Sequence, residues 1–277
     1  MGLRINTNVA SLAAQRSLGQ SKMNLDNNLR KLSSGERITR SADDAAGLAI
    51  SEKLKAHIRG VRQAKRNADD GISFIQTAEG GLSEISSIVI RLRELAIQAA
   101  SDTVGETERG FSDIEFQQLK DEINRIAKGM EFNGRKLLDG TGGTVEIQVG
   151  IHNDAQLDRL RYEASDVDST LETLGLSTET IATKETAQTS LQKLDDALVS
   201  ISGSRANLGA LQNRLNSTIN NLAVTDENFS AANSRIRDVD VAAETADMTK
   251  NNILNQAGVS VLAQANQAPQ FALKLLG

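Results

Sequence analysis

A seven-residue repeat of apolar side chains runs through the second half of the chain and limits what it can fold into. Its members follow one another without a gap: Ala187, Leu194, Ile201, Leu208, Leu215, Leu222, Phe229 and Ile236. Such a repeat is typical of an α-helix that packs against a helical partner along its whole length. No proline lies within 187–236, so these residues can form one helix about 75 Å long, at about 1.5 Å per residue. A helix of this length needs a partner of similar length.

The same helix carries a second apolar row that polar residues interrupt. The apolar members are Leu191, Leu198 and Ile219, and the interrupting residues are Arg205, Gln212, Asp226 and Asn233. Polar residues at such positions usually fix the register between two helices rather than add stability. We expect that role for these four residues.

The partner helix is predicted upstream, where a second seven-residue repeat begins. Its members are Leu54, Val61, Ala68, Ile75, Leu82, Val89 and Ala96. Glycines such as Gly71 and Gly80 each weaken a helix by about 1 kcal/mol relative to alanine, but small residues also allow close packing, so one helix is expected. The predicted seam of the rod is Leu54, Val61, Ile75, Leu82, Leu194, Ile201, Leu208, Leu215 and Leu222.

Each end of the chain carries a shorter amphipathic stretch with the same spacing. The stripe residues are Leu18, Leu25 and Leu32 in the N-terminal arm, and Leu254, Val261, Ala268 and Leu275 in the C-terminal arm. The first arm is expected to end as a helix near Gly35. Neither arm has a core of its own, and ordering costs about 1–2 kcal/mol per residue. We expect the arms to pack against each other through these stripes and to gain further surface from other copies.

Shorter elements are predicted between these helices. Ser41 and Asp44 have the spacing of a capping box that would start the first long helix. A helix near 106–128 should return antiparallel to it. The apolar side of that helix would be Ile114, Leu119, Ile123 and Ile126. Alternating apolar residues predict a β-hairpin near 144–162, and 163–180 is expected to be a polar loop.

The predicted fold is therefore mainly α. It is a long antiparallel coiled-coil-like helical rod with one small β-hairpin, and its terminal helices pair as a coiled coil.

The composition excludes most kinds of chemistry. The chain has no cysteine, and its two histidines, His57 and His152, fall on a predicted helix seam and in a predicted hairpin turn. The glycines of 140–143 precede a strand and lack the Lys-Ser/Thr pair of a phosphate-binding loop. We expect no enzyme, no cofactor and no metal. Because the net charge is −5 and no basic cluster is present, nucleic-acid binding is not expected either.

Membrane insertion is not expected. The N-terminus lacks the basic stretch, apolar run and cleavage site of a secretory signal. No apolar run approaches the ~20 residues that cross a bilayer. Once enzymes, nucleic-acid-binding proteins and membrane proteins are set aside, the remaining class is a protein that interacts with other proteins.

Several stretches resemble the signatures of bacterial flagellins. Residues 28–35 and 40–51 (NLRKLSSG and RSADDAAGLAIS) resemble the N-terminal signature of that family. Residues 236–240 and 261–267 (IRDVD and VLAQANQ) are similar to its C-terminal signature, and LRELA at 92–96 and FNG at 132–134 match its outer-domain helices and turn. Many flagellins carry large variable outer domains, for which the 163–183 connection leaves no room. The chain is therefore identified as a short flagellin without them.

The resemblance implies an extracellular structural subunit of the hollow helical flagellar filament used for motility. It implies an inner terminal-helix domain of 1–44 plus 236–277 and an outer rod domain of 45–235. The arm stripes would then be the polymerisation seam, made of Leu18, Leu25, Leu32, Leu254, Val261 and Leu275.

The resemblance also implies partners beyond other flagellin subunits. These are hook-filament junction and cap proteins, type III export with an export chaperone that binds the C-terminal arm, and the flagellin-sensing Toll-like receptor of innate immunity. The face near Arg91, Leu95 and Glu115 looks like the receptor contact of many flagellins. Arg91 and Leu95 lie one helical turn apart and off the main seam, so we expect both to be accessible.

Two other functions would share parts of this pattern. A hook-filament junction protein has similar termini but is usually longer or weaker in the terminal signatures. A secreted helical adhesin or needle-type protein would share the rod and the absence of cysteine, but it would not explain both terminal signatures. Catalytic flagellins need an insert with His-Glu-x-x-His, which this chain lacks.

Overall fold

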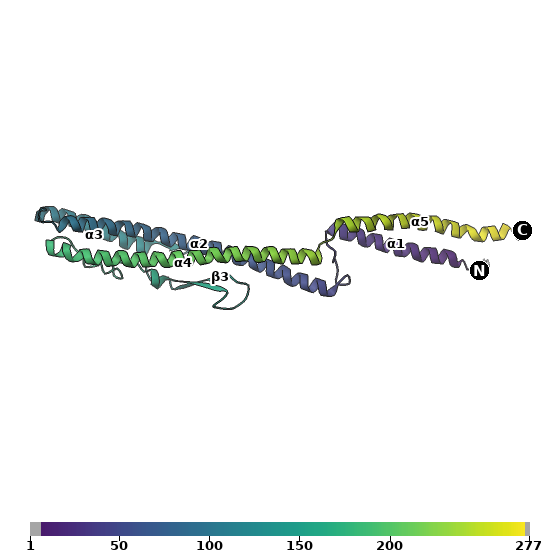
Figure 1. Cartoon of the computed structure of the whole chain (residues 1–277), viewed down its shortest axis with the longest axis horizontal. Helices are drawn as coiled ribbons and strands as arrows, with labels where there is room; N and C mark the ends of the chain where they lie inside the picture. The colour runs from purple at the N-terminus through teal and green to yellow at the C-terminus, as the bar shows by residue number, and fades with distance from the viewer. Residues whose placement is uncertain (1–6, 275–277) are drawn as a thin grey trace. The chain divides into compact units, whose positions relative to one another are not determined.

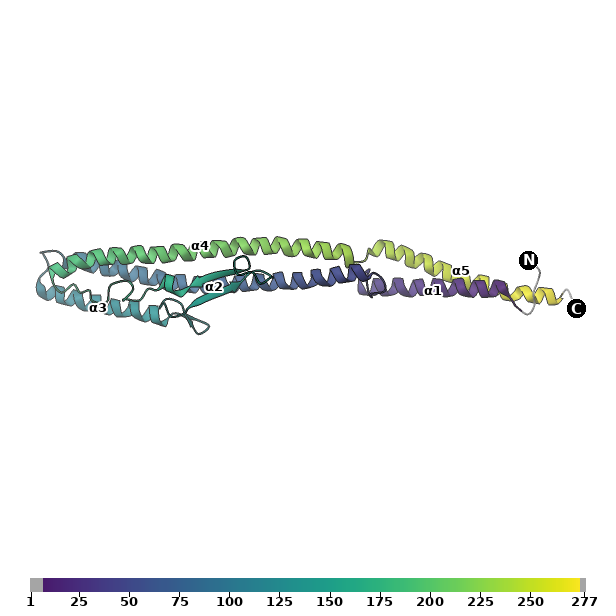
Figure 2. The same ribbon diagram turned by 90° about the horizontal axis from the view of Figure 1, so that it is seen from below.

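Five α-helices dominate the structure (Figures 1 and 2). The computed structural model describes the backbone of residues 7–274 and the side chains of residues 7–267. The helices are α1 (Val9–Ser34), α2 (Ala45–Ala99), α3 (Glu106–Gly129), α4 (Lys184–Arg237) and α5 (Val241–Lys274). The short elements are β1 (Glu131–Phe132), β2 (Arg135–Lys136), β3 (Thr144–Gln148), β4 (Arg159–Glu163) and the 3₁₀ turn η1 (Ala164–Val167). The predicted mainly α class is confirmed.

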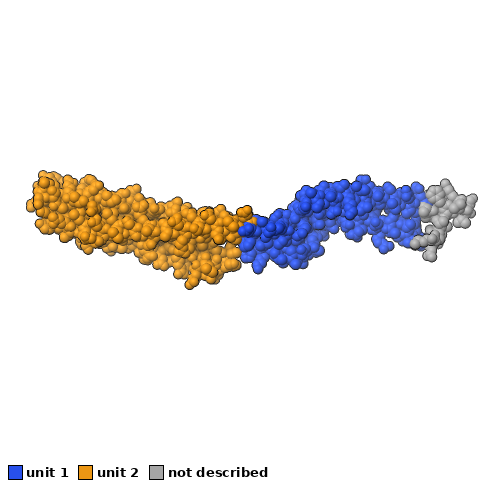
Figure 3. Space-filling model, viewed as in Figure 1, with its two compact units in different colours: residues 1–57, 228–277 blue, residues 58–227 orange. Residues whose placement is uncertain are grey.

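The chain divides into two compact units, which Figure 3 colours separately. The terminal unit comprises 1–57 and 228–277, and the central unit comprises 58–227. Both boundaries fall inside a helix, because α2 and α4 continue unbroken through their seven-residue repeats. The prediction that each is a single helix is confirmed. The division into 1–44 plus 236–277 and 45–235 stays a prediction.

Local signals set the ends of the first two helices. Gly35 follows α1 with a φ of +70°, the left-handed conformation that ends many helices. Asp44 begins α2, because its Oδ1 accepts a hydrogen bond of 2.9 Å from the Gly47 amide. The predicted cap by Ser41 is wrong, since Asp44 directly precedes the first helical residue and Ser41 lies in the turn before it.

The predicted rod seam is buried in the central unit. Each of its members there is at most 9 % exposed: Val61, Ile75, Leu82, Leu194, Ile201, Leu208, Leu215 and Leu222. Leu54 lies in the terminal unit and is half-buried.

The buried face of α4 is wider than its apolar pattern predicts. A row of mostly small residues three positions after the main repeat is also buried: Ser190, Ala197, Ser204 and Leu211. The Ser190 hydroxyl donates to the Thr180 carbonyl at 3.2 Å, and the Ser204 hydroxyl donates to the Asp166 carbonyl at 3.1 Å. The connection between β4 and α4 therefore covers this row.

That connection is not the polar loop that the sequence predicts. Leu174, Leu176 and Ile181 are at most 5 % exposed and belong to the core of the central unit. The Lys120 ammonium of α3 holds it by donating to the Ser177 and Glu179 carbonyls at 3.1 and 2.7 Å. Burial lowers the pKa of Lys120. A short segment thus covers part of a long helix because most of its large apolar residues are buried.

Three of the four polar residues that interrupt the α4 repeat meet polar partners on α2. In the central unit, Asp226 accepts from the Arg62 Nε at 3.0 and 3.1 Å, and Arg205 lies 3.7 Å from Glu79. In the terminal unit, Asn233 accepts from the buried Ser51 hydroxyl at 2.8 Å. These pairs agree with the expected role in register.

Helix α3 packs through a stripe that differs from the predicted one. Phe116, Ile123 and Ala127 are fully buried, whereas Ile114 is 62 % exposed. Ile114 precedes Phe116 by two residues, or about 200° around the helix, so both cannot face the core. The aromatic ring makes the larger contact, and the prediction for Ile114 is wrong.

The predicted hairpin forms between β3 and β4. It pairs Val145 with Tyr162 and Ile147 with Leu160, which confirms the hairpin. A Cβ on Gly71 of α2 would lie 2.7 Å from Ile147 Cδ1. Gly71 therefore makes room for the hairpin rather than for a helix. A second, smaller hairpin joins β1 and β2.

Two kinds of feature are absent from the described part of the chain. None of its helices is long and apolar enough to cross a membrane. Among residues 7–267, no group of three or more His, Cys, Asp or Glu side chains could hold a metal ion.

We predict opposite effects of alanine at two glycines of α2. Gly80→Ala should raise the free energy of unfolding by about 1 kcal/mol, since it improves helix propensity and a Cβ there meets nothing within 4 Å. The free energy of unfolding of Gly71→Ala should be about 1–3 kcal/mol lower than that of Gly80→Ala, because the new Cβ displaces Ile147. Urea unfolding followed by circular dichroism measures both. Equal effects of the two substitutions would contradict this packing.

A second prediction concerns Tyr162, the single tyrosine of the chain. Its hydroxyl donates to the buried Leu137 carbonyl at 2.6 Å, and burial raises the pKa of Tyr162 well above its usual value. The folded state then keeps the proton that the unfolded state releases near pH 10, so stability is complete below pH 10 and falls by about 1.4 kcal/mol per pH unit above it. In denaturant titrations at pH 9 to 11.5, Tyr162→Phe should lose less stability than the parent chain. Absorbance at 295 nm should show tyrosinate only on unfolding, and tyrosinate in the folded protein near pH 10 would refute the assignment.

Candidate assembly surface on the terminal helices

The terminal helices α1 and α5 lie side by side (Figures 1 and 2), which confirms their predicted pairing. Leu18, Leu25 and Leu32 of α1 are half-buried on the side facing α5. Gly258 of α5 makes room for this row, since a Cβ there would lie 3.2 Å from Leu18 Cδ1.

Much of the seam between the two helices is polar. Ser11 and Asn28 are its most buried residues on α1, at 6 and 7 % exposed. The Ser11 hydroxyl donates to Asn266 Oδ1 at 2.8 Å. The half-buried row on α5 contains Glu244, Met248, Asn251, Asn255, Gly258, Leu262 and Ala265. Few large apolar side chains are therefore used in pairing the arms.

Many of the large apolar residues of the arms are exposed instead. Leu254 and Val261 are 46 and 54 % exposed, so the expectation that they pack between the arms is wrong. Each directly precedes a residue of the half-buried row, Asn255 or Leu262, and is rotated from it by about 100°. Other apolar residues more than 45 % exposed on these helices are Val9, Leu12, Met23, Leu29, Val241, Ile253 and Val259. Leu275, also predicted for this seam, lies outside the described residues.

Backbone hydrogen bonds tie the two chain segments together at the base of the arms. The Val239 amide donates to the Gly35 carbonyl at 3.0 Å, and the Arg37 amide donates to the Arg237 carbonyl at 2.6 Å. Glu36 and Asp238 form an antiparallel β-bridge between these bonds. The segment that leaves α1 and the segment that enters α5 are therefore held in one register.

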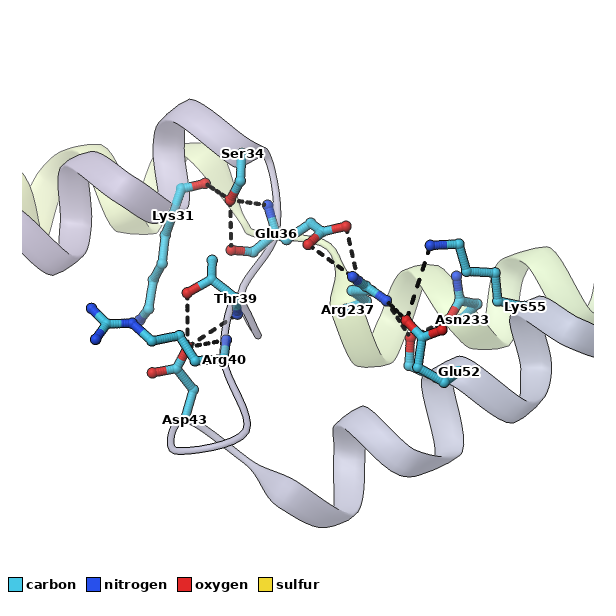
Figure 4. Close-up of polar contacts among 11 residues, drawn as sticks. Lys31, Ser34, Glu36, Thr39, Arg40, Asp43, Glu52, Lys55, Asn233 and Arg237 are labelled. Atoms are coloured by element: carbon cyan, nitrogen blue, oxygen red, sulfur yellow. Dashed lines mark hydrogen bonds and ion pairs between the residues drawn. The ribbon is translucent and has the colours of Figure 1, made fainter.

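A charged cluster around Arg237 reinforces this junction (Figure 4). The guanidinium contacts Glu52 at 2.5 Å and Glu36 at 2.8 Å. The hydrogen bonds that the guanidinium donates to Glu52 and Glu36 raise the pKa of Arg237. Because Arg237 is the last residue of α4 and Glu52 lies in the first turns of α2, the cluster joins both long helices to the loop after α1.

The loop between α1 and α2 is braced in the same way (Figure 4). The Asp43 Oδ2 accepts hydrogen bonds from the Thr39 amide, the Thr39 hydroxyl and the Arg40 amide, at 2.9 to 3.0 Å. These bonds lower the pKa of Asp43. Sequence reasoning missed this role and the Arg237 cluster, because neither belongs to an apolar repeat. The available signal was the density of charged residues at and near the helix ends.

The predicted receptor contact is only partly accessible. Arg91 on α2 and Glu115 on α3 form an exposed ion pair of 2.8 Å, and Arg91 also contacts Glu94 at 3.0 Å. The pKa of Arg91 is raised, first by its hydrogen bond to Glu115. Leu95 is 3 % exposed, so the expectation that it is accessible is wrong. It belongs to the same core cluster as Phe116 of α3, and the two-helix pattern could not reveal that α3 shares this core.

Known proteins resemble this chain over nearly its whole length. The profile of the bacterial flagellin N-terminal helical region matches residues 5–142, and that of the bacterial flagellin C-terminal helical region matches 191–276. A flagellin of Halalkalibacterium halodurans is 48 % identical over 98 % of this chain and 99 % of its own length.

Solved structures agree with this match. The crystal structure of Bacillus cereus flagellin has a TM-score of 0.51 at 37 % identity and covers 57 % of this chain and 88 % of that one. A putative flagellar hook-associated protein from Vibrio parahaemolyticus has a TM-score of 0.58 over 71 % of this chain and all of its own, but at 13 % identity it shares the fold alone. The chain therefore belongs to the bacterial flagellin family and, like the flagellins that it matches, is a structural subunit of the extracellular flagellar filament and not an enzyme.

Proposed function

We propose that copies of this flagellin join mainly through the outward apolar residues of α1 and α5. The observation that carries this proposal is the distribution of side chains on the arms. The seam between α1 and α5 is rich in small and polar residues, while Leu254, Val261 and their apolar neighbours are about half exposed. A single folded domain normally buries such residues in its own core. Here they remain available for other copies.

The free energy gained by burying each of these residues against another copy is modest, but the gain is repeated in every subunit. Fully burying a leucine or valine contributes about 1.5–3 kcal/mol. Since Leu254 and Val261 are about half buried already, covering the rest adds about 0.7–1.5 kcal/mol each. The half-buried leucines of α1, Leu18, Leu25 and Leu32, orient the arm pair that presents this surface.

This surface fits the proposed division of the chain in the filament. Residues 1–44 and 236–277 would form an inner layer in which arms of neighbouring copies pack against each other. Residues 45–235 would form the outer layer. The bonds at Gly35 and Arg37 support a boundary near this point, because they fix how the arm pair begins.

The same exposed residues suggest partners before and during assembly. Exposed apolar residues of α5, among them Ile253, Leu254 and Val259, would need to be covered before assembly, and an export chaperone that binds this arm would do so. Export would follow the flagellar type III route. Hook-filament junction and cap proteins would contact the arm surfaces left open at the two ends of a filament.

Replacing Leu254 and Val261 together by serine should raise the critical concentration for polymerisation about 10- to 100-fold, because about 1.5–3 kcal/mol of burial is lost in each subunit. Sedimentation of polymer seeded with filament fragments measures this change. Val199→Ser is the matched control, since Val199 is 73 % exposed on α4 in the central unit. Its critical concentration should stay within about twofold of the parent. Normal filaments from the double serine variant would rule out the arm surface.

We also propose that Arg91 and Glu115 form the accessible part of a contact with the flagellin-sensing Toll-like receptor. Arg91→Ala should raise the concentration of monomer needed for signalling in receptor-bearing cells about tenfold, the usual effect of losing an interface arginine. The matched control is Arg125→Ala, because Arg125 is also exposed and pairs with a glutamate, Glu122. Equal signalling by the parent and the Arg91 variant would disprove the contact.

A further inference from the structure

The turn between β1 and β2 contains the single Asn-Gly pair of the sequence, Asn133-Gly134. It joins Phe132 to Arg135, which lie opposite each other in the two strands. Both turn residues have a positive φ, 49° at Asn133 and 77° at Gly134. A two-residue type I′ turn requires such values, and asparagine and glycine adopt them most readily. Both residues are exposed, so the fold places this pair at an accessible hairpin tip.

The two groups of this pair that can react with each other are unrestrained. Among the described residues, no hydrogen bond holds the Asn133 side chain or the Gly134 amide. A Cβ on Gly134 would meet nothing within 4 Å, so the amide nitrogen has open space around it and no side chain of its own to shield it. Asparagine is also one of the thermolabile residues of proteins.

We propose that Asn133 is a site of spontaneous modification, in which the Gly134 nitrogen attacks the Asn133 side chain and the β1–β2 hairpin sets the rate. The nitrogen bonds to Asn133 Cγ, the Cγ–Nδ2 bond breaks, and ammonia leaves with the proton of the Gly134 amide. Water then opens the resulting five-membered ring. Cleavage at Cγ gives aspartate. Cleavage at the main-chain carbonyl carbon gives isoaspartate, in which the backbone runs through Cβ and Cγ.

The folded turn opposes closure of this ring. A left-handed residue has a ψ of about +47°, which places the following nitrogen on the opposite side of the Cα–C bond from Cβ. The ring needs both atoms on the same side, so the hairpin must open first. The rate in the folded protein is then the rate in the open hairpin multiplied by the fraction of time that the hairpin is open. With two residues in each strand, the hairpin is marginal by itself.

Contact with the core keeps this hairpin closed. Phe132 packs edge-on against Phe74 of α2, with ring centroids 5.6 Å apart, and Phe74 packs edge-on against Tyr162 at 4.9 Å. Isoaspartate adds one carbon to the backbone of the turn, so the two turn residues no longer join the strands in their present register. The modification should therefore loosen the packing of Phe132.

Trypsin gives direct access to the site, because cleavage after Lys128 and Arg135 releases residues 129–135 as one peptide. Folded monomer kept in mildly alkaline buffer should accumulate aspartate and isoaspartate in this peptide, as mass spectrometry detects. The same chain in urea should do so about 10- to 100-fold faster, because its turn is always open. Asn153, which is exposed but precedes Asp154, is the internal control and should stay unmodified over the same time.

Two results would overturn the proposal. Equal rates in buffer and in urea would show that the hairpin does not set the rate. A peptide that reacts in urea but never in the folded protein would show that the folded turn is not a modification site.

Two variants separate the chemistry from the packing. Phe132→Leu should raise the rate in the folded protein about tenfold, because losing the aromatic contact opens the hairpin more often, and should leave the rate in urea unchanged. Asn133→Gln should give no product over the same time, because its ring would need six members. An unchanged folded-state rate in Phe132→Leu would contradict the role of the hairpin.

The isoaspartate form, separated from aged monomer, tests the structural consequence. Asn133→Asp is its matched control, since it carries the same added charge on an ordinary backbone. The isoaspartate form should have a lower urea midpoint than this variant, because only its turn is longer. Equal midpoints would show that the turn is not coupled to the packing of Phe132 and would overturn that part of the proposal.

Discussion

The buried core that α2 and α4 build together is the feature on which the rest of the central unit depends. Leucine, isoleucine and valine alternate with alanine and glycine on α2, and serine and alanine form a buried row on α4. Other segments pack where these side chains are small. Ile147 of the hairpin packs against Gly71 of α2, and the connection before α4 packs against Ser190 and Ser204. The small residues therefore leave space in which a hairpin and a connecting segment pack into the core of the central unit.

The long helices and the hairpin could be predicted because their periodicity is explicit in the sequence. The repeat that ends at Ile236 corresponds to a helix that ends at Arg237, and the strand alternation placed Ile147 opposite Leu160. What could not be predicted is which second face of a helix becomes buried. Ser190 is buried by the connection that precedes α4, and Leu95 shares a core with residues of α3, whereas a repeat describes only one partner. The direction of Leu254 was missed for a different reason, because α5 pairs through asparagine, glycine and alanine as much as through leucine.

The two units use their apolar residues in opposite ways. In the central unit the large apolar residues of the seam are buried within one chain, whereas on α1 and α5 many of them face solvent and the seam between the helices is partly polar. A polar seam gives register at a cost in stability. For a subunit of a polymer this distribution leaves apolar surface available to other copies while the arm pair keeps a defined alignment. The location of the candidate assembly surface could be predicted, because the terminal helices have no core of their own. Which side chains this surface presents could not be predicted.

The junction at Gly35 and Arg237 has a mechanical consequence. Two backbone hydrogen bonds and the Arg237 cluster connect the segment that leaves α1 to the segment that enters α5. Tension applied to either terminal helix therefore passes into both segments before it reaches the long helices. Bonds of this kind lie across neighbouring antiparallel segments, so a load along the chain acts on them together in shear. A rotating filament would transmit torque through paired connections at each subunit, and neither connection would bear the load alone.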